Sequence, residues 1–155
     1  MSFVKKYAPT ALHEMVLEQS VKSTLDSYVL GGNKTPLILH GTNGLGKTSV
    51  AELLPSAMEN GAEIKLLNSP TDTFAKVNDV ITFFRNKFAF SLTSFSGGAR
   101  EYFVLDEVSF KKEVALEFRK YMEKYDDVVQ FIFTTNSYMQ LDKGIRDRCI
   151  DIQFK

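Results

Sequence analysis

The sequence has a single cysteine, Cys149, and it has no cluster of cysteine and histidine residues with the spacing of a zinc site. Because one thiol cannot form an internal disulfide, we expect a reducing, intracellular compartment. No apolar run approaches the ~20 residues of a membrane-spanning helix, so we expect no membrane association. The chain does not open with a charged segment followed by an apolar one, so no secretion signal is expected. Internal repeats and low-complexity tracts are also absent.

The sequence also lacks an excess of charge, because 19 Lys and Arg residues balance 19 Asp and Glu residues. A protein that works on nucleic acid alone is usually basic, so the composition gives no support to DNA binding. A local basic patch, or a ring of subunits, would still supply a positive field. The length of 155 residues, with 44% hydrophobic and 25% charged residues, is that of one globular domain.

The most informative stretch fits the pattern G-x-x-x-x-G-K-T, and its residues are Gly41, Thr42, Asn43, Gly44, Leu45, Gly46, Lys47 and Thr48. It follows an apolar run at 37–40 and precedes a helical pattern, which is the context of a phosphate-binding P-loop. Glycines let successive N–H groups turn toward phosphate oxygens, and the helix N-terminus favours negative charge. Lys47 is expected to reach the β- and γ-phosphates, and Thr48 to hold Mg²⁺. The alternative is a glycine-rich turn before an ordinary helix, but the flanking strand and helix favour a nucleoside triphosphate site.

Hydrophobic periodicity predicts helices that alternate with strands. Helices are expected at 18–30, about 46–57, 72 to about 89 and 111–124, and strands at 37–40, 63–67, 102–105, 128–134 and 150–154. Pro55 lies late in the second helix, where it is expected to cause fraying or a kink. The third helix is expected to carry an apolar face formed by Phe74, Val77, Ile81, Phe84 and Phe88. The alternation predicts an α/β fold with a doubly wound parallel sheet of about five strands, with ligands at the strand C-termini.

Asp106 and Glu107 come directly after the apolar strand at 102–105. An acidic pair in this place is the Walker B arrangement, in which Asp106 holds Mg²⁺ and Glu107 activates the attacking water as a general base. By itself the pair is weak, because acidic residues also follow strands as helix caps. The upstream P-loop favours the catalytic interpretation, since the metal needs a protein ligand there.

Asn136 follows the strand at 128–134, so it is expected at the same edge of the sheet. Its amide would orient a water molecule against the γ-phosphate, and the alternative is an ordinary turn-forming asparagine. Arg146 and Arg148 precede the last strand. They are either solvated surface residues or a source of positive charge for a neighbouring subunit's phosphate, an arginine finger. Spacing alone leaves both questions open.

Together these motifs resemble those of the AAA+ ATPases, and more narrowly the clamp-loader branch of replication factor C small subunits and bacteriophage clamp-loader large subunits. Five segments in the same order carry the resemblance. Residues 6–9 (Lys-Tyr-Ala-Pro) resemble the family's Lys-Tyr-Arg-Pro arm, and residues 106–108 resemble its D-E-A/F box. Residues 118–123 resemble the Leu-Arg-Arg-x-Met-Glu helix, 135–136 the sensor 1 strand end, and 145–149 the Ser-Arg-Cys motif.

The resemblance implies one AAA+ nucleotide-binding domain over residues 1–155, with an N-terminal arm and helix at 1–36 and a P-loop core at 37–155. It implies an ATP hydrolase that uses ATP and Mg²⁺ and is active only in an oligomer. Catalysis is assigned to Glu107, Lys47 and Asn136, with Arg148 acting in trans on the neighbouring subunit's ATP, and the metal to Thr48 and Asp106. The implied ATP-binding set is Gly41, Thr42, Asn43, Gly44, Leu45, Gly46, Lys47, Thr48, Ser49, Tyr7, Ala8 and Pro9.

The implied partners are other AAA+ clamp-loader subunits in a pentamer, a sliding clamp and primer–template DNA, without a membrane. The location is the cytoplasm of a bacterial or phage-infected cell, or the nucleus of a eukaryote. The implied function is to couple ATP binding and hydrolysis to clamp opening and loading onto DNA. Another AAA+ replication or repair ATPase, such as a helicase loader or branch-migration motor, and a non-catalytic ATP-binding assembly subunit are the alternatives. The candidate DNA contacts are Lys76, Arg85, Lys87 and Arg100, and the expected clamp contact is the helix around 110–122.

Several positions depart from the family pattern. Ala8 stands in place of the arm's arginine, and Ala115 in place of a glutamine that couples the ATP site to DNA. Asp147 replaces the serine of Ser-Arg-Cys and is expected to pair with Arg146 or Arg148. The sequence also stops after the last strand, where the family continues into a helical lid and a collar, so we expect an excised ATPase core.

Overall fold

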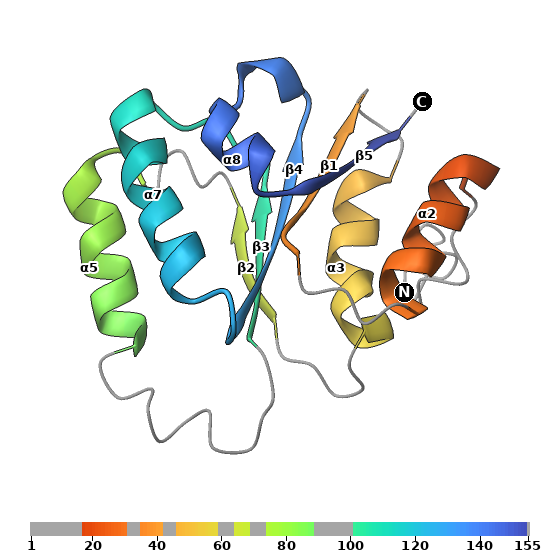
Figure 1. Ribbon diagram of the computed structural model, residues 1–155, viewed down its shortest axis with the longest axis horizontal. Coiled ribbons are helices and arrows are strands. Elements are labelled where there is room, and N and C mark those ends of the chain that lie inside the picture. The colour runs from red at the N-terminus through yellow and green to blue at the C-terminus, as the bar shows by residue number, and fades with distance from the viewer. Residues whose placement is uncertain are drawn as a thin grey trace, which may run out of the picture.

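In the computed structural model, residues 17–30, 35–41, 46–58, 64–68, 74–88 and 101–154 are described. A parallel sheet with helices on both faces forms this part of the chain (Figure 1). The strands are β1 (Leu37–Gly41), β2 (Ile64–Asn68), β3 (Glu101–Asp106), β4 (Val129–Thr135) and β5 (Ile150–Phe154). The helices are α2 (Gln19–Leu30), α3 (Lys47–Met58), α5 (Val77–Phe88), α7 (Lys112–Lys124) and α8 (Lys143–Asp147), with a short 3₁₀ helix, η2 (Tyr138–Gln140).

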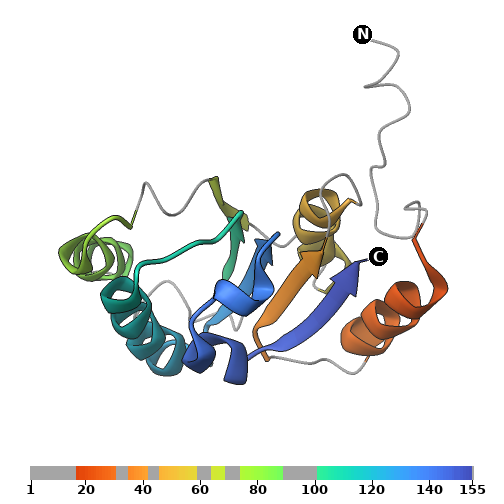
Figure 2. The ribbon, with the colours of Figure 1, turned by 90° about the horizontal axis from the view of Figure 1, so that it is seen from above.

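The sheet has five strands in the order β2-β3-β4-β1-β5, and every pairing is parallel. The strand β1 lies inside the sheet, because it pairs with β4 on one side and with the edge strand β5 on the other. Figure 2 shows α3 on one side of this sheet and α7 and α8 on the other, with α2 beside the β5 edge. The predicted doubly wound α/β fold with about five parallel strands is therefore confirmed.

Each face of the sheet has its own hydrophobic core, because successive strand residues point to opposite faces. On β3, Phe103 and Leu105 belong to the core that includes residues of α5 and α7, whereas Val104 belongs to the core that includes residues of α2 and α3. The first core is rich in phenylalanine, and Phe118 of α7 makes an edge-to-face contact with Phe131 of β4 at 5.7 Å between ring centroids. Buried apolar residues on both faces explain why the central strands read as continuous hydrophobic runs.

Most predicted boundaries lie within a residue or two of the observed ones, and α5 is the exception. It begins at Val77 rather than at residue 72, and the backbone N–H of Lys76 donates to the Asp79 carboxylate at 3.0 Å in its first turn. The predicted inner face is also rotated, because Val80 is fully buried whereas Val77 and Ile81 are half-buried. The helix α3 continues through the buried Pro55 to Met58. No described helix is long and apolar enough to cross a bilayer.

The parallel arrangement brings the C-terminal ends of β1, β3 and β4 to one edge of the sheet. The residues that follow these strand ends, Lys47 and Thr48 after β1, Glu107 after β3 and Asn136 after β4, share that edge with the N-terminus of α3. Sequence segments about 60 and 90 residues from the glycine-rich stretch are thereby brought together.

Candidate active site

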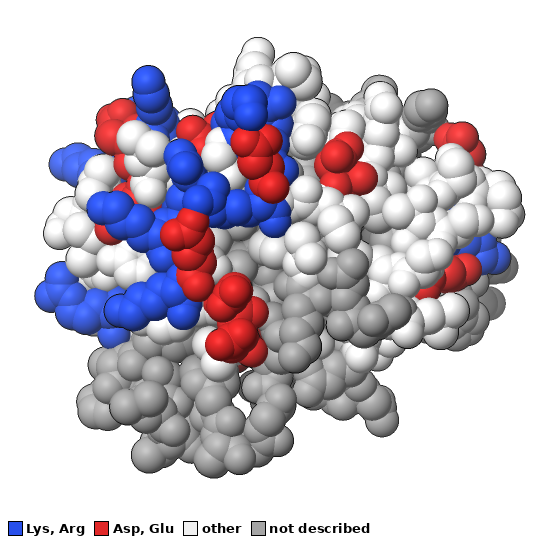
Figure 3. Space-filling model, in the orientation of Figure 1, with Lys and Arg blue, Asp and Glu red and all other residues white. Residues whose placement is uncertain are grey.

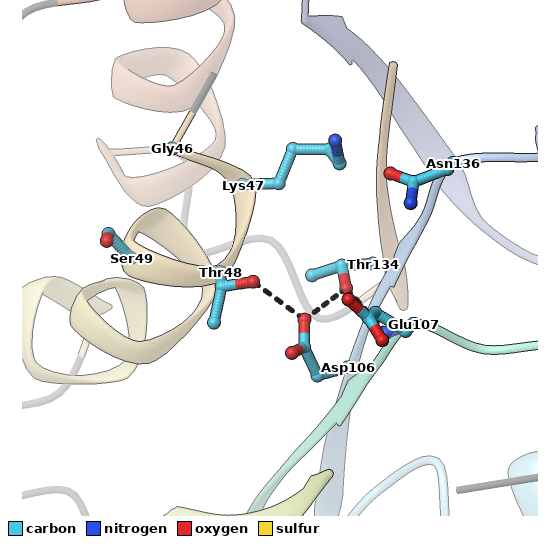
Figure 4. Close-up of a pocket in the computed structure, with 8 residues that line it drawn as sticks. All are labelled: Gly46, Lys47, Thr48, Ser49, Asp106, Glu107, Thr134 and Asn136. Atoms are coloured by element: carbon cyan, nitrogen blue, oxygen red, sulfur yellow. Dashed lines mark hydrogen bonds between the residues drawn. The ribbon is translucent and has the colours of Figure 1, made fainter. Parts of the chain in front are cut away.

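A cleft of about 210 Å³ opens at this edge, and the residues that line it are Gly46, Lys47, Thr48, Ser49, Asp106, Glu107, Thr134 and Asn136. Figure 4 shows Lys47 and Thr48 entering the cleft from the start of α3, facing Asp106 and Glu107 at the end of β3 and Asn136 beyond β4. The structure therefore brings together seven of the residues that the sequence pattern predicts for the site: Gly46, Lys47, Thr48, Ser49, Asp106, Glu107 and Asn136.

Lys47 is buried at the start of α3, and only 7% of its surface is exposed. Its ammonium group donates a hydrogen bond to the carbonyl oxygen of Gly41 at 2.8 Å. Burial lowers the pKa of Lys47, and the Asp106 and Glu107 carboxylates oppose this by raising it. A buried cation with two nearby carboxylates and one backbone carbonyl is poised to exchange these partners for an anionic ligand.

Gly41 adopts φ +133°, which favours glycine, and it lies against β5. A Cβ atom at this position would lie 2.1 Å from the carbonyl oxygen of Phe154. The first glycine of the phosphate-loop pattern therefore meets both a backbone requirement and a packing requirement. Gly46 also has positive φ, +85°, where the chain enters α3.

A chain of hydroxyl and carboxylate contacts joins the start of α3 to the ends of β3 and β4. The Thr48 hydroxyl donates to Asp106 Oδ1 at 2.8 Å, and the Thr134 hydroxyl donates to the same oxygen at 2.6 Å. Thr134 Oγ1 also accepts a hydrogen bond from the Glu107 backbone N–H at 2.9 Å. The dashed lines in Figure 4 mark the two contacts to Asp106. Asp106 is thus held by hydroxyl groups from α3 and β4.

Glu107 occupies the left-handed region with φ +57°, an uncommon conformation for a residue other than glycine. Two hydrogen bonds hold the turn, since Glu107 N–H donates to Thr134 Oγ1 and Val108 N–H donates to the Thr134 carbonyl, each at 2.9 Å. Strain of this kind costs about 1–3 kcal/mol and persists where the surroundings fix it. The turn leaves the Glu107 side chain exposed at the cleft.

The sequence pattern places Thr134 within a buried strand and does not mark it as a site residue. It is 1% exposed and lines the cleft. The available signal was polarity, because Thr134 and Thr135 follow a run of apolar residues in β4 just where a ligand site is expected.

The donor set fits Mg²⁺, which prefers oxygen ligands and keeps several waters while using one or two carboxylates and substrate phosphates. Asp106 supplies a carboxylate and Thr48 a hydroxyl, and their oxygens already lie 2.8 Å apart. The described residues contain no group of three or more His, Cys, Asp or Glu side chains that would enclose a metal. These two protein ligands suit a metal ion that is also bound by the phosphates of a nucleotide.

Arg148 does not line the cleft, and within its own chain it contacts α7 and α8. Its Nε donates to Glu123 Oε1 at 2.9 Å and its Nη1 to the Gly144 carbonyl at 2.8 Å, while Nη2 also contacts Glu123. The expected partner, Asp147, forms an ion pair with Lys143 at 2.8 Å instead. The prediction that Asp147 pairs with Arg146 or Arg148 is therefore wrong, because the (i, i+4) spacing along α8 places Lys143 beside it.

The described candidates for DNA contact lie on or beside α5. Lys76 and Arg85 are exposed, and Lys87 forms an ion pair with Glu101 at 2.8 Å. Figure 3 shows Lys and Arg side chains gathered over the half of the molecule that contains α5, α7 and α8, with acidic side chains among them. Ala115, on the inner face of α7, is buried in the core. The described residues do not include Tyr7, Ala8, Pro9, Thr42, Asn43, Gly44, Leu45 or Arg100.

Residues 37–155 match the model of the ATPase family associated with various cellular activities (AAA). Among curated proteins, the chain is 29% identical over 159 residues to the probable replication factor C subunit 2 of Dictyostelium discoideum, covering 99% of this chain and 46% of that protein. It is 28% identical over 156 residues to the replication factor C small subunit of Methanoculleus marisnigri, covering 99% and 48%. The chain thus spans about half the length of these relatives. The resemblance to replication factor C small subunits is confirmed.

Solved structures with the same fold include the Thermotoga maritima RuvB Holliday junction branch migration motor, at a TM-score of 0.64 and 23% identity. That match covers 93% of this chain and 48% of the other. Caenorhabditis elegans PCH-2 matches at a TM-score of 0.71 and 17% identity, covering 93% and 45%. At these identities the likeness establishes the fold alone.

Proposed function

The chain belongs to the ATPase family associated with various cellular activities (AAA), and on that premise we propose that it is an ATP-hydrolysing subunit of a DNA polymerase sliding-clamp loader. The observation that carries the ATPase part is the convergence of Lys47, Thr48, Asp106, Glu107 and Asn136 on one cleft. A site that only held ATP for assembly would have no use for a carboxylate beyond the metal ligand. The clamp-loader part rests on the likeness to replication factor C subunits.

Each residue of the cleft has a chemical task in this proposal. Lys47 exchanges the Gly41 carbonyl for phosphate oxygens and neutralises their charge. Glu107 takes a proton from the attacking water, and Asn136 orients that water from the neighbouring strand end. Gly46 and Ser49 lie at the start of α3, where backbone N–H groups and the helix dipole favour phosphate.

Mg²⁺ would be held by Thr48 and Asp106, and when bound it would neutralise charge on the phosphate oxygens. Thr134 keeps Asp106 facing that position through its 2.6 Å hydrogen bond. The same hydroxyl fixes the turn that carries Glu107, so one side chain orients both the metal ligand and the base.

Arg148 would act on ATP bound by a neighbouring subunit. Two features support this role: it does not line the cleft of its own chain, and its side chain is one third exposed, at 32%. Its partner Glu123 is 59% exposed, so the pair lies at the surface where a neighbour would meet it. A cation supplied in trans makes hydrolysis depend on assembly.

The DNA and clamp contacts in this proposal lie on the half of the molecule that carries α5 and α7. DNA would be held through phosphates by helix N-termini and by basic side chains such as Lys76 and Arg85. Leu116 of α7 is 44% exposed and would serve the clamp contact. Lys87 would contact DNA only after its ion pair with Glu101 is broken.

The test is a Glu107→Gln variant, studied in the oligomer that hydrolyses ATP. ATP binding is expected to persist and hydrolysis to fall by about 10²–10⁴-fold, because a general base contributes that much. Glu113→Gln, an exposed glutamate in the first turn of α7, is the matched control and should retain activity. Normal turnover by Glu107→Gln would refute the assignment of the base.

A second arm tests the clamp-loader part. Sliding clamp and primer–template DNA together should raise the ATP hydrolysis rate, and the DNA dependence should weaken steeply with salt. If neither changes the rate while Lys47→Ala abolishes it, the protein is an AAA ATPase with another partner.

A further inference from the structure

A second cavity, of about 900 Å³, adjoins the active-site cleft and shares Asn136 with it. Its lining combines the C-terminal end of β1 and two residues of β5 with residues 136–140, the segment that follows β4. His40, Tyr138 and Asp151 lie in this lining. None of these three residues has a task in the proposed hydrolysis, although they lie beside the asparagine that is expected to orient water.

Three side chains from three elements are stacked and bonded in this second cavity. The ring of Tyr138, on η2, stacks on the imidazole of His40 with centroids 4.2 Å apart and planes at 17°. His40 Nε2 lies 2.9 Å from Asp151 Oδ2 on β5. Burial, and then the charge of the Asp151 carboxylate, raise the pKa of the Tyr138 phenol. His40 is only 9% exposed, which makes it a fixed surface for the tyrosine ring.

Arg146 of α8 holds the same segment. Its guanidinium lies over the Tyr138 ring at 5.5 Å, and its Nε donates to the Leu141 carbonyl at 3.1 Å. The segment is therefore held at two points. The Tyr138 ring contacts His40 of β1 and Arg146 of α8, and the Leu141 carbonyl is hydrogen-bonded to Arg146. The Ser137 backbone N–H donates to Thr135 Oγ1 at 3.0 Å, so the turn that carries Asn136 is fixed at both ends.

His40 also connects to the phosphate site through the backbone. It immediately precedes Gly41, whose carbonyl accepts the hydrogen bond from Lys47. Asn136 is exposed, and its place depends on the backbone of residues 136–138.

We infer that His40 and Tyr138 are positioning residues for ATP hydrolysis: their stacked pair, anchored by Asp151 and Arg146, fixes Asn136 relative to the phosphate-loop strand. This inference rests on the proposed function, because it deepens the role of Asn136 in that site. It predicts that the stack affects the transition state, where the water must be aligned, more than the binding of ATP.

The experiment compares Tyr138→Ala, Tyr138→Phe and His40→Ala in the hydrolysing oligomer. We expect Tyr138→Ala and His40→Ala to lower kcat by about 10–100-fold, since a misplacement of about 1 Å costs up to that much, with KM for ATP changed by less than about twofold. Tyr138→Phe keeps the stacking ring and should restore most of kcat. Gln140→Ala, an exposed residue of the same segment and cavity, is the matched control and should resemble the wild type.

Affinity for ADP with aluminium fluoride, a transition-state mimic, supplies a second readout and should fall in parallel with kcat, while affinity for a non-hydrolysable ATP analogue stays constant. If Tyr138→Ala does not fold, Tyr138→Leu takes its place. Equal kcat in Tyr138→Ala and wild type, or an equal loss in Tyr138→Ala and Tyr138→Phe, would overturn the stack as a positioning device. A wild-type protein without Lys47-dependent hydrolysis would instead overturn the proposed function and this inference with it.

Discussion

Replacing Thr134 with valine would remove one hydroxyl group from the cleft while keeping a β-branched side chain of nearly the same shape in β4. The hydroxyl donates to Asp106 Oδ1 at 2.6 Å and accepts from the Glu107 N–H at 2.9 Å. Thr134 is 1% exposed, so water has little access to replace these contacts. The change therefore probes two hydrogen bonds without creating a large cavity.

The expected loss of stability follows from the donor that is left without an acceptor. An unsatisfied buried group costs about 1–3 kcal/mol, and the left-handed turn at Glu107 loses one of its two supports. At roughly 2–4 °C per kcal/mol for a domain of this size, Tm should fall by about 2–12 °C. Thr134→Ser keeps the hydroxyl and is expected to lie close to wild type in kcat.

Urea unfolding measures the stability, and ATP turnover by the oligomer measures the effect on catalysis. Because Asp106 and Glu107 both lose orientation, kcat should fall by a larger factor than the affinity for ATP, the affinity being measured without Mg²⁺. A Thr134→Val protein with wild-type unfolding free energy and wild-type kcat would show that the hydroxyl orients neither carboxylate. A loss shared equally by Thr134→Ser would point to packing instead.

Three further changes test other parts of the structure. Gly41→Ala should lower the free energy of unfolding in urea by more than about 2 kcal/mol, because alanine disfavours a φ of +133° and its Cβ would lie 2.1 Å from the Phe154 carbonyl oxygen. A near-neutral result would contradict the β1–β5 geometry. Burial raises the pKa of Cys149 from 9.0 to about 12, so at pH 8 iodoacetamide should alkylate it about a thousandfold more slowly in the folded than in the urea-unfolded protein. Alkylation rates of the folded and unfolded protein that agree within about tenfold would argue against burial of the thiol. The hydrogen bond from Arg148 holds the pKa of Glu123 below its usual 4.5. The pair should therefore stabilise the fold above pH 4.5, and this stabilisation should be lost as the pH falls through the lowered pKa of Glu123. Glu123→Gln should remove this pH dependence from the free energy of unfolding.

The fold was predictable because its determinants are local. Apolar runs such as residues 102–105 and 150–154 identified the buried strands, and a helical period identified α7 to within a residue. The α5 helix was placed less well, because Val77 and Ile81 share the helical spacing of Phe84, and only packing against the sheet selects Val80. Neither η2 nor α8 was predicted, since each is too short to show a period.

The candidate site was predictable where a motif carried the chemistry, as at Lys47 and Asp106. Contacts between distant segments were not. Thr134 is 28 residues from Asp106, and Glu123 is 25 residues from Arg148, so neither pair has a local signature. The same holds for His40 and Asp151, which are 111 residues apart and meet only because β1 and β5 are neighbours.

The charges of the cleft explain why the proposed chemistry needs help from outside the chain. Its described lining carries one cation, Lys47, and two carboxylates, Asp106 and Glu107, so it is on balance negative before an anionic triphosphate arrives. Burial already works against the charge on Lys47, and that lysine is engaged with the Gly41 carbonyl. In the proposed mechanism, electrostatic stabilisation of the developing phosphate charge therefore needs further positive charge, part of which Mg²⁺ held by Thr48 and Asp106 would supply. Arg148 is one third exposed and bound to Glu123 on the surface of its own chain, so in this proposal it would supply further charge to a neighbouring subunit's nucleotide once Glu123 is displaced.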